Sequence, residues 1–290
     1  MNNFKKWEIK KIDKKDFPPQ LKVIKNCPEF LYYRGNWDNK IFEKSLAVVG
    51  SRRMSRYGQE ISKKMVSELV MQKISIISGF MYGVDTQSHL SALEMGGITI
   101  AVLGGGLNVL TPPENEKLYW QILENKGLII SEYEKDFQPT LWSFPQRNRI
   151  VSGLSSLGVL VVEAGLKSGS LVTARIAREQ GKKVWAIPGQ IGCSVAEGTN
   201  YLIKNNLVKM VTESGDIFKK SAKTNQEVIF ESLDPLENLI LKELKVEALS
   251  MDELSIKSGI DVVQLSTKIS MMALEEKVAE ENGKVYLNSV

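Results

Sequence analysis

The sequence has few of the residues from which disulfide, metal and catalytic sites are usually built. Its 290 residues include one histidine, two cysteines and nine prolines. Cys27 and Cys193 lie far apart and form no Cys-x-x-Cys pair, which excludes a disulfide framework and a cysteine zinc site. The motifs G-x-S-x-G, G-x-x-x-x-G-K-[ST] and H-E-x-x-H are also missing. The hydrolase, nucleotide-loop and metalloprotease sites that they mark are therefore not expected.

Long apolar segments are missing as well. No run of about 18 apolar residues occurs, so we expect no membrane-spanning helix. The basic stretch MNNFKKWEIKKIDKK has no apolar segment behind it, which argues against a secretory signal. Charged residues make up 25% and hydrophobic residues 43% of the chain, which is ordinary for a globular protein. We expect a cytoplasmic protein that has no membrane contact.

Positive charge is spread unevenly over the chain. Residues 1–45 carry 11 Lys and Arg against 6 Asp and Glu, and residues 46–218 carry 18 against 15. Residues 219–290 carry 9 Lys and Arg against 13 Asp and Glu. The formal net charge of the whole chain is +4. If the protein binds a polyanion, the last segment is the least suited to do so.

Apolar runs and helical patterns alternate through the middle of the chain. Amphipathic stretches at residues 57–71, 85–95, 114–125 and 170–180 separate runs that are continuous in Val, Ile and Leu. Continuous apolar runs are typical of strands buried on both faces, and their alternation with helices predicts a parallel sheet. We therefore expect an α/β fold with a doubly wound, mostly parallel Rossmann-like sheet over residues 45–218. The predicted strands are residues 45–50, 74–79, 98–106, 127–132, 158–164, 183–189 and 208–211.

The two ends of the chain have different patterns. Residues 1–44 are interpreted as an irregular, basic N-terminal extension, because prolines interrupt any helix there. The polar segment 219–230 is interpreted as a linker. In residues 231–290, Asp234-Pro235 and the Ser250–Glu253 capping box predict helix starts. Asn282-Gly283 predicts a hairpin, so three helices and a hairpin indicate a small winged-helix domain.

The strand ends carry small and basic residues that suit an anion. Glycines let backbone N–H groups approach a phosphate, and arginine binds phosphate in a bidentate manner. In a doubly wound sheet these loops meet in one crevice at the carboxyl ends of the strands. The candidate residues of the first loops are Gly50, Ser51, Arg52, Arg53, Gly79, Gly104 and Gly105. Solvated or acid-paired arginines are the alternative.

Two later segments complete the candidate site. In FPQRNRIVSGLS, Arg147, Asn148 and Arg149 begin a short helix on which the two arginines point apart. One of them is expected to face the crevice and the other to face outward or pair with an acid. After the strand at residues 158–164, the turn Lys167, Ser168, Gly169 and Ser170 fits an anion. An ordinary turn in which Ser170 caps the helix is the alternative.

A catalytic centre is not expected. Asp85 and His89 lie four residues apart on one helix face, but two ligands do not make a metal site. A hydrogen-bonded structural histidine is the favoured interpretation. Glu163 could act as a general acid or base, yet nothing in the sequence pairs it with a nucleophile. We predict no catalytic residues, no metal and no cofactor.

Seven stretches of this sequence resemble the DNA-processing protein A (DprA/Smf) family. They run in the family's order from about residue 17 to residue 206. In the stretch ISGFMYGVDTQSH, this chain has Met81, Val84 and Ser88 where members of the family usually have other residues. None of these differences removes a basic residue. The stretches are FPPQLKVIKNCPEFLYYRGN, AVVGSRRMSRYG, ISGFMYGVDTQSH, AVLGGGLNVLTPPEN, FPQRNRIVSGLS, EAGLKSGSLVTARIAREQGKKVWAIPG and EGTNYLIKNN.

The resemblance implies a non-enzymatic mediator that binds single-stranded DNA. It also implies homodimers, protection of incoming DNA and loading of the recombinase RecA onto it during natural transformation. Arg52, Arg147, Arg149 and the turn 167–170 would line the DNA-binding crevice. Bases could stack on Tyr57, Tyr82 or Phe144, and a role of these aromatic residues in the core is the alternative.

Two other functions remain open at the level of sequence. A nucleotide-processing enzyme of the phosphoribohydrolase type would use the same crevice, but the loop P-G-G-x-G-T of those enzymes is replaced by EAGLKSGS. A protein that acts only as an interaction scaffold would still bind its partners after Arg52 and Arg147 were replaced. The acidic C-terminal unit offers Lys268 as the one basic residue of its third helix before Lys277. We therefore predict weak duplex binding by this unit or none.

Overall fold

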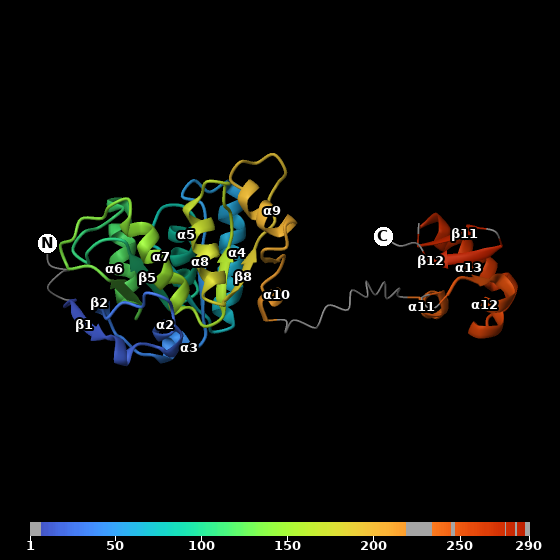
Figure 1. Cartoon of the computed structure of the whole chain (residues 1–290), viewed down its shortest axis with the longest axis horizontal. Coiled ribbons are helices and arrows are strands. Elements are labelled where there is room, and N and C mark those ends of the chain that lie inside the picture. The colour runs from blue at the N-terminus through green and yellow to red at the C-terminus, as the bar shows by residue number, and fades with distance from the viewer. Residues whose placement is uncertain (1–6, 219–233, 245–246, 276, 282, 288–290) are drawn as a thin grey trace. The chain divides into compact units, whose positions relative to one another are not determined.

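A computed structural model describes residues 7–218, 234–244, 247–275, 277–281 and 283–287. The chain divides into two compact units, Met1–Lys220 and Ser221–Val290, and many of their helices and strands are labelled in Figure 1. The predicted linker 219–230 and the first residues of the predicted C-terminal domain lie outside the described residues. No helix in the described ranges has the length and apolar character needed to span a membrane.

The large unit is built on one nine-stranded sheet in the order β1-β2-β6-β5-β4-β3-β7-β8-β9. The strands from β3 onward pair in parallel, and all seven predicted strands are present. Successive strands add on one side from β3 to β6 and then on the other side from β7 to β9. This reversal confirms the predicted doubly wound fold. The strands are β3 (Ser45–Val49), β4 (Ser75–Ser78), β5 (Thr99–Leu103), β6 (Leu128–Ser131), β7 (Gly158–Val161), β8 (Lys183–Ala186) and β9 (Lys209–Met210).

The N-terminal segment differs from the prediction. Strand β1 (Lys10–Asp13) pairs with β2 (Phe30–Gly35), and β2 pairs antiparallel with β6. The interpretation of residues 1–44 as an irregular extension is therefore wrong over these residues, which complete one edge of the sheet. Both strands are partly exposed, and prolines lie between them. For these reasons they lack the continuous apolar pattern of the buried strands.

Helices cover both faces of the sheet because alternate strand residues point in opposite directions. Ala47 and Val49 belong to a cluster with residues of α2 (Pro19–Lys22), α3 (Lys40–Glu43), α7 (Ser143–Leu154), α8 (Gly169–Glu179) and α9 (Glu197–Lys204). Leu46 and Val48 belong to the cluster that includes α4 (Arg56–Met71), α5 (Val84–Glu94) and α10 (Gly215–Phe218). Helix α6 (Glu116–Glu124) packs with Ala101 and Ile129.

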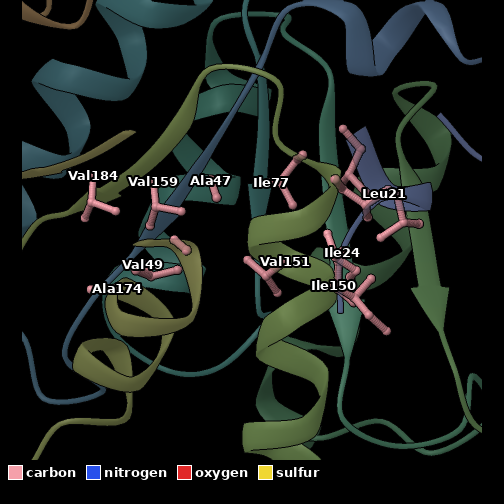
Figure 2. Close-up of a cluster of buried hydrophobic side chains, with 14 of the residues drawn as sticks. Leu21, Ile24, Ala47, Val49, Ile77, Ile150, Val151, Val159, Ala174 and Val184 are labelled. Carbon is pink, nitrogen blue, oxygen red and sulfur yellow. The ribbon is translucent and has the colours of Figure 1, made fainter. Parts of the chain in front are cut away.

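The short helix α2 ties the N-terminal segment to the core. Leu21 and Ile24 lie beside Ile150 of α7, as Figure 2 shows. A Cβ added to Gly153 of α7 would lie 2.9 Å from Leu21 Cδ1 and 3.0 Å from Ile24 Cδ1. The missing side chain at Gly153 therefore allows the segment to pack closely on α7, the helix that carries the RNR motif.

The small unit has the element order α11 (Pro235–Leu244), β10 (Leu249–Ser250), α12 (Met251–Ser258), α13 (Val262–Leu274), β11 (Val278–Glu281), β12 (Lys284–Leu287). Its three strands form an antiparallel sheet in the order β10-β12-β11. The Ser250–Glu253 capping box is present, and Gly259 ends α12 at φ 70°. Asn282 of the predicted hairpin turn lies outside the described residues. The assignment of this unit as a winged helix stays a prediction.

Replacing Leu21 with alanine tests whether the N-terminal segment belongs to the core. We expect Leu21→Ala to lower the free energy of unfolding of the large unit by about 2–5 kcal/mol, because a fully buried leucine leaves a cavity. Val23, which is 82% exposed, provides the matched control, and Val23→Ala should change stability by less than about 0.5 kcal/mol. Denaturant unfolding monitored by tryptophan fluorescence measures both. Equal stabilities of the two variants would contradict the packing described here.

Candidate functional site

A crevice of about 750 Å³ lies at the carboxyl ends of β3 and β7, where the strand order reverses. Doubly wound sheets bind their ligands at this position, because the loops leaving the two strands run to opposite sides and leave a gap. The loop after β3 forms one wall, the first turns of α7 form a second, and the loop after β7 forms a third.

The crevice brings together eleven of the fourteen predicted site residues. Asp85, Phe144 and Thr173 also line it, together with the apolar side chains of Leu141 and Val151. The predicted residues found there are Gly50, Ser51, Arg52, Arg53, Gly79, Arg147, Asn148, Lys167, Ser168, Gly169 and Ser170.

Arg52 and Arg53 are exposed cations of the crevice, as is Lys167. Neither forms an ion pair with an acid in the described part of the chain, whereas Arg56 pairs with Glu60 at 2.9 Å. The Arg52 guanidinium lies over the Phe144 ring, 5.3 Å from its centre, in a cation–π arrangement. The alternative of acid-paired arginines therefore applies to Arg56 and not to Arg52 or Arg53. These two remain available for an anionic ligand.

Glu163 holds the loop that carries these arginines. Its backbone carbonyl accepts a 2.7 Å hydrogen bond from the Ser51 N–H. Its buried carboxylate accepts hydrogen bonds from the N–H of Ser55 at 2.9 Å and from its hydroxyl at 2.5 Å. A Cβ at Gly58 would lie 2.2 Å from Glu163 Oε2. Glu163 is therefore committed to positioning this loop, which argues against a general acid or base at this residue.

Arg147 is the buried cation of the crevice. It is 4% exposed, and its guanidinium donates to the carbonyl oxygens of Gly79 and Val102. Burial lowers the pKa of Arg147 to about 10, so the residue stays charged at neutral pH. A Cβ at Gly79 would lie 2.7 Å from Asp85 Oδ2 and 2.9 Å from Arg147 Nη2. Gly79 thus leaves room for the carboxyl and the guanidinium to approach.

Asp85 is the acidic member of this buried pair. Burial raises the pKa of its carboxyl, and the neighbouring Arg147 opposes that rise. Its Oδ2 atom accepts a hydrogen bond from the Met81 N–H at 3.2 Å. Asp85 and Arg147 are both buried, so the exposed Arg52, Arg53 and Lys167 are the main source of attraction for an anion.

Arg149 lies outside the crevice, which corrects its assignment as a lining residue. Its guanidinium binds both carboxylate oxygens of Glu132, with Nη1 2.9 Å from Oε2. It also donates to the carbonyl oxygens of Asn26 at 2.9 Å and Gln146 at 2.8 Å. Arg147 is therefore the arginine of the RNR motif that faces the crevice. Arg149 joins α7 to the loop before β2.

Gly104 and Gly105 also lie outside the crevice lining, which corrects their assignment as phosphate-binding residues. A Cβ at Gly104 would lie 2.7 Å from the Phe144 ring, and one at Gly105 would lie 3.0 Å from Pro139. At Gly106 the added atom would lie 2.2 Å from the Glu134 carbonyl oxygen. Gly104 thus makes room for Phe144 of α7, and Gly105 and Gly106 make room for the loop between β6 and α7.

The turn after β7 presents a helix N-terminus to the crevice. Ser168, not Ser170, caps α8, and its side chain accepts a hydrogen bond from the Ser170 N–H. The two serine hydroxyls lie 2.7 Å apart, and Lys167 beside them is exposed. Helix N-termini favour anions through their free N–H groups and the helix dipole. The turn therefore combines an ordinary cap with features suited to an anion.

His89 is a structural histidine, as predicted, and does not pair with Asp85. It is fully buried, and its Nδ1 atom lies 2.6 Å from the Thr99 hydroxyl. Because that hydroxyl donates to the Ile76 carbonyl oxygen at 3.0 Å, His89 must donate through Nδ1–H. This arrangement fixes the neutral ring to the end of β5.

Comparison with known proteins gives a consistent match over the large unit. Residues 8–222 match the family model described as DNA recombination-mediator protein A. The chain is 44% identical over 207 residues to Protein Smf of Escherichia coli K12, covering 71% of this chain and 54% of that protein. It is 42% identical over 201 residues to DNA processing protein DprA of Streptococcus pneumoniae R6, covering 69% of this chain and 70% of that protein. The chain thus spans about half the length of the E. coli relative.

Two solved structures are similar in fold and sequence. DNA processing protein A from Streptococcus pneumoniae aligns with a TM-score of 0.67 and 38% identity, over 75% of each chain. DNA processing protein A from Helicobacter pylori aligns with a TM-score of 0.65 and 31% identity, over 72% of this chain and 94% of that one. The latter structure was studied for the single-stranded DNA binding mode of the Helicobacter protein.

The environment of His89 gives a testable pH dependence. Burial lowers the pKa of its imidazole to about 3, whereas an unfolded histidine titrates near 6.5. Between these values the unfolded chain binds more protons than the folded chain, so His89 lowers stability as pH falls through this window. Because the chain has one histidine, its ring signals in an NMR titration need no further assignment. We expect them to stay unchanged from about pH 8 to pH 5, and a midpoint near 6.5 would contradict the buried position.

Proposed function

The chain belongs to the DNA recombination-mediator protein A family, and on that premise we propose that it is a single-stranded DNA-binding mediator. In this proposal it protects incoming DNA and loads the recombinase RecA onto it in natural transformation and recombination. The observation that carries the proposal is the crevice at the β3/β7 switch point. There the exposed Arg52 and Arg53 line the same space as the turn 167–170 and the apolar side chains of Leu141 and Val151.

Phosphate groups would bind at the basic side of this crevice. Arg52 and Arg53 offer guanidinium groups that no acid in the described residues neutralises, and Lys167 adds a third exposed cation. Gly169 and Ser170, at the start of α8, line the same crevice, and the Ser170 N–H donates to the Ser168 side chain there. Charged donors and a helix N-terminus together suit phosphate oxygens, and each neutralised phosphate releases counterions.

The apolar part of the crevice favours a single strand over a duplex. Phe144, Leu141 and Val151 line the same space as the cations. Unpaired nucleotides can place their bases against such side chains, while a duplex keeps its bases stacked inside. Tyr57 and Tyr82, the other aromatic candidates, donate their hydroxyls to the Pro188 carbonyl oxygen and to Glu114. Phe144 lines the crevice and the two tyrosines do not, so Phe144 is the better placed of the three for stacking.

The proposal includes self-association into a homodimer and action in the cytoplasm, where a recombinase meets DNA. It does not include catalysis. Glu163 is the acid that sequence alone left available, and its carboxylate binds Ser55 in the loop after β3. A phosphoribohydrolase would need a free acid or base in the crevice, and this use of Glu163 favours binding over turnover.

We also propose that the C-terminal unit does not bind duplex DNA. Lys268 on α13 lies 2.6 Å from an Asp234 carboxylate oxygen and 3.3 Å from one of Glu237, and its side chain is 16% exposed. A lysine in such a cluster is not free to contact phosphates. The exposed positions of α13 hold the uncharged polar residues Gln264, Ser266, Thr267 and Ser270 beside the apolar Val263, Met271 and Leu274. None of them is basic, whereas helices that bind a DNA groove bring basic residues to the bases and the backbone.

The effect of Arg52→Ala on DNA binding tests the proposed function. Fluorescence anisotropy with a labelled oligonucleotide, single-stranded and duplex, is measured over a salt series. We expect a preference of the native chain for the single strand. In the variant, Kd should rise roughly tenfold, and the salt slope should shrink by about 0.7 because one phosphate contact is lost.

Arg178 provides a matched control for this experiment. It is an exposed arginine in the last turn of α8, at the end away from the crevice. Arg178→Ala should leave affinity and salt slope at the native values. Absence of binding by the native chain at low salt, or an equal loss in both variants, would refute the crevice as the binding site.

The C-terminal prediction is tested by Lys268→Ala in the full chain. We expect Kd for single-stranded and duplex oligonucleotides to stay within about twofold of native, because Lys268 is occupied by acids. Loss of the Lys268 side chain should instead destabilise the small unit. The buried carboxylate of Glu237 then keeps Lys277 as an ion-pair partner but loses Lys268. Thermal unfolding measures the second effect. A selective loss of duplex binding would show that α13 contacts DNA.

A further inference from the structure

Three aromatic rings gather on the loop between β6 and α7, next to the crevice. The rings of Tyr133 and Phe137 are stacked with centres 4.5 Å apart. Trp142 meets both edge-on, at 5.9 Å from Tyr133 and 6.0 Å from Phe137. We call these three residues the aromatic platform. Its members are not part of the crevice lining, and the function proposed above does not use them.

Exposure distinguishes this platform from an ordinary core cluster. The side chain of Trp142 is 58% exposed, and the preceding Leu141 is 93% exposed. All five tryptophans lie in the described part of the chain, and the other four are buried or partly buried there. A large ring left open beside a binding crevice usually marks a contact surface.

The platform is held in place rather than loosely attached. The Gly106 N–H donates to the Phe137 carbonyl oxygen at 2.9 Å, and the Asn108 N–H donates to the Lys135 carbonyl oxygen at 2.8 Å. The close approach at Gly104, Gly105 and Gly106 requires that none of them carries a side chain. The GGG turn, which does not line the crevice, thus seats the loop that presents the rings.

The platform is continuous with the proposed DNA path. Trp142 occupies the N-cap position of α7, and its neighbours Leu141 and Phe144 line the crevice. A strand bound at Arg52 and Phe144 would therefore meet Trp142 as it leaves the crevice. Glu134 and Asp136 on the same loop are exposed and outnumber the exposed Lys135 between them, so the loop does not attract phosphates and the uncharged bases are the part of a nucleotide that fits.

We propose that the aromatic platform is a second nucleobase-binding subsite, on which a base of the strand leaving the crevice stacks against Trp142. This inference rests on the proposed single-stranded DNA binding, and it adds a contact that recognises bases instead of phosphates. Its consequence is a longer binding site than the crevice alone provides. The added affinity depends little on salt, because stacking on a ring releases no counterions.

The first experiment compares Trp142→Ala and Trp142→Phe with the native chain, using a single-stranded oligothymidylate of about 20 nucleotides. One base stacked on an aromatic ring corresponds to a roughly 5- to 20-fold change in Kd. We expect that loss in Trp142→Ala, with the salt slope unchanged, and near-native affinity in Trp142→Phe. Met71→Ala is the control: Met71 is 69% exposed at the far end of α4 from the crevice, and its loss should change nothing.

The second experiment removes bases instead of the ring. An oligonucleotide of the same length has thymines only in a central block of about six nucleotides and abasic residues on both flanks, so its phosphates are unchanged. The native chain should bind it as weakly as Trp142→Ala binds the full oligothymidylate. Trp142→Ala itself should not distinguish the two oligonucleotides. Intrinsic fluorescence should be quenched by the full oligothymidylate in the native chain, and much less in Trp142→Phe.

The outcomes separate this inference from the proposed function. If the native chain and Trp142→Ala bind equally well with equal salt slopes, the platform is not a subsite although the crevice binds DNA. If the native chain does not bind at all, the proposed function fails first. A change of oligomeric state in Trp142→Ala, measured by light scattering without DNA, would show that the platform contacts a second copy, and this also overturns the inference.

Discussion

The contacts of Glu163 connect the two loops on which the crevice depends. β3 and β7 are neighbours in the sheet, and the chain continues from them in opposite directions. The backbone and the carboxylate of Glu163, just after β7, hold Ser51 and Ser55 in the loop after β3. A buried carboxylate is stable only when its hydrogen bonds are satisfied. The same contacts that satisfy Glu163 therefore fix the position of Arg52 and Arg53.

Glycine has a related role on the other side of the crevice. At Gly79 the missing Cβ leaves room for Asp85 and Arg147, and at Gly104 it leaves room for Phe144. In each case a glycine allows protein atoms, not ligand atoms, to come close. The glycines thus determine where α7 and the loop before it lie. Side chains on these two elements form one wall of the crevice.

The sequence predicted the parallel sheet well and the details of the site less well. β3 to β8 are buried on both faces, so each has a continuous apolar run that can be recognised locally. β1 and β2 are half exposed, and β2 is held in place by pairing with β6, which is distant in sequence. Likewise, the three consecutive glycines indicate in the sequence that another part of the chain packs closely against them. The sequence does not show which part of the chain that is. The partner of Arg149, Glu132, could not be identified from spacing either.

The crevice separates two roles of positive charge that sequence alone could not assign. Arg147 is buried, bonded to two backbone carbonyls and faced by Asp85, so it contributes to the electric field but is already occupied by protein acceptors. Arg52 and Arg53 are exposed, and exposed cations can exchange their counterions for phosphate. Removing Arg147 would leave the buried Asp85 without its cation and disturb the fold. Arg52 is exposed and its side chain contacts the Phe144 ring, so its removal disturbs the fold less than removal of Arg147 and makes it the cleaner probe of binding.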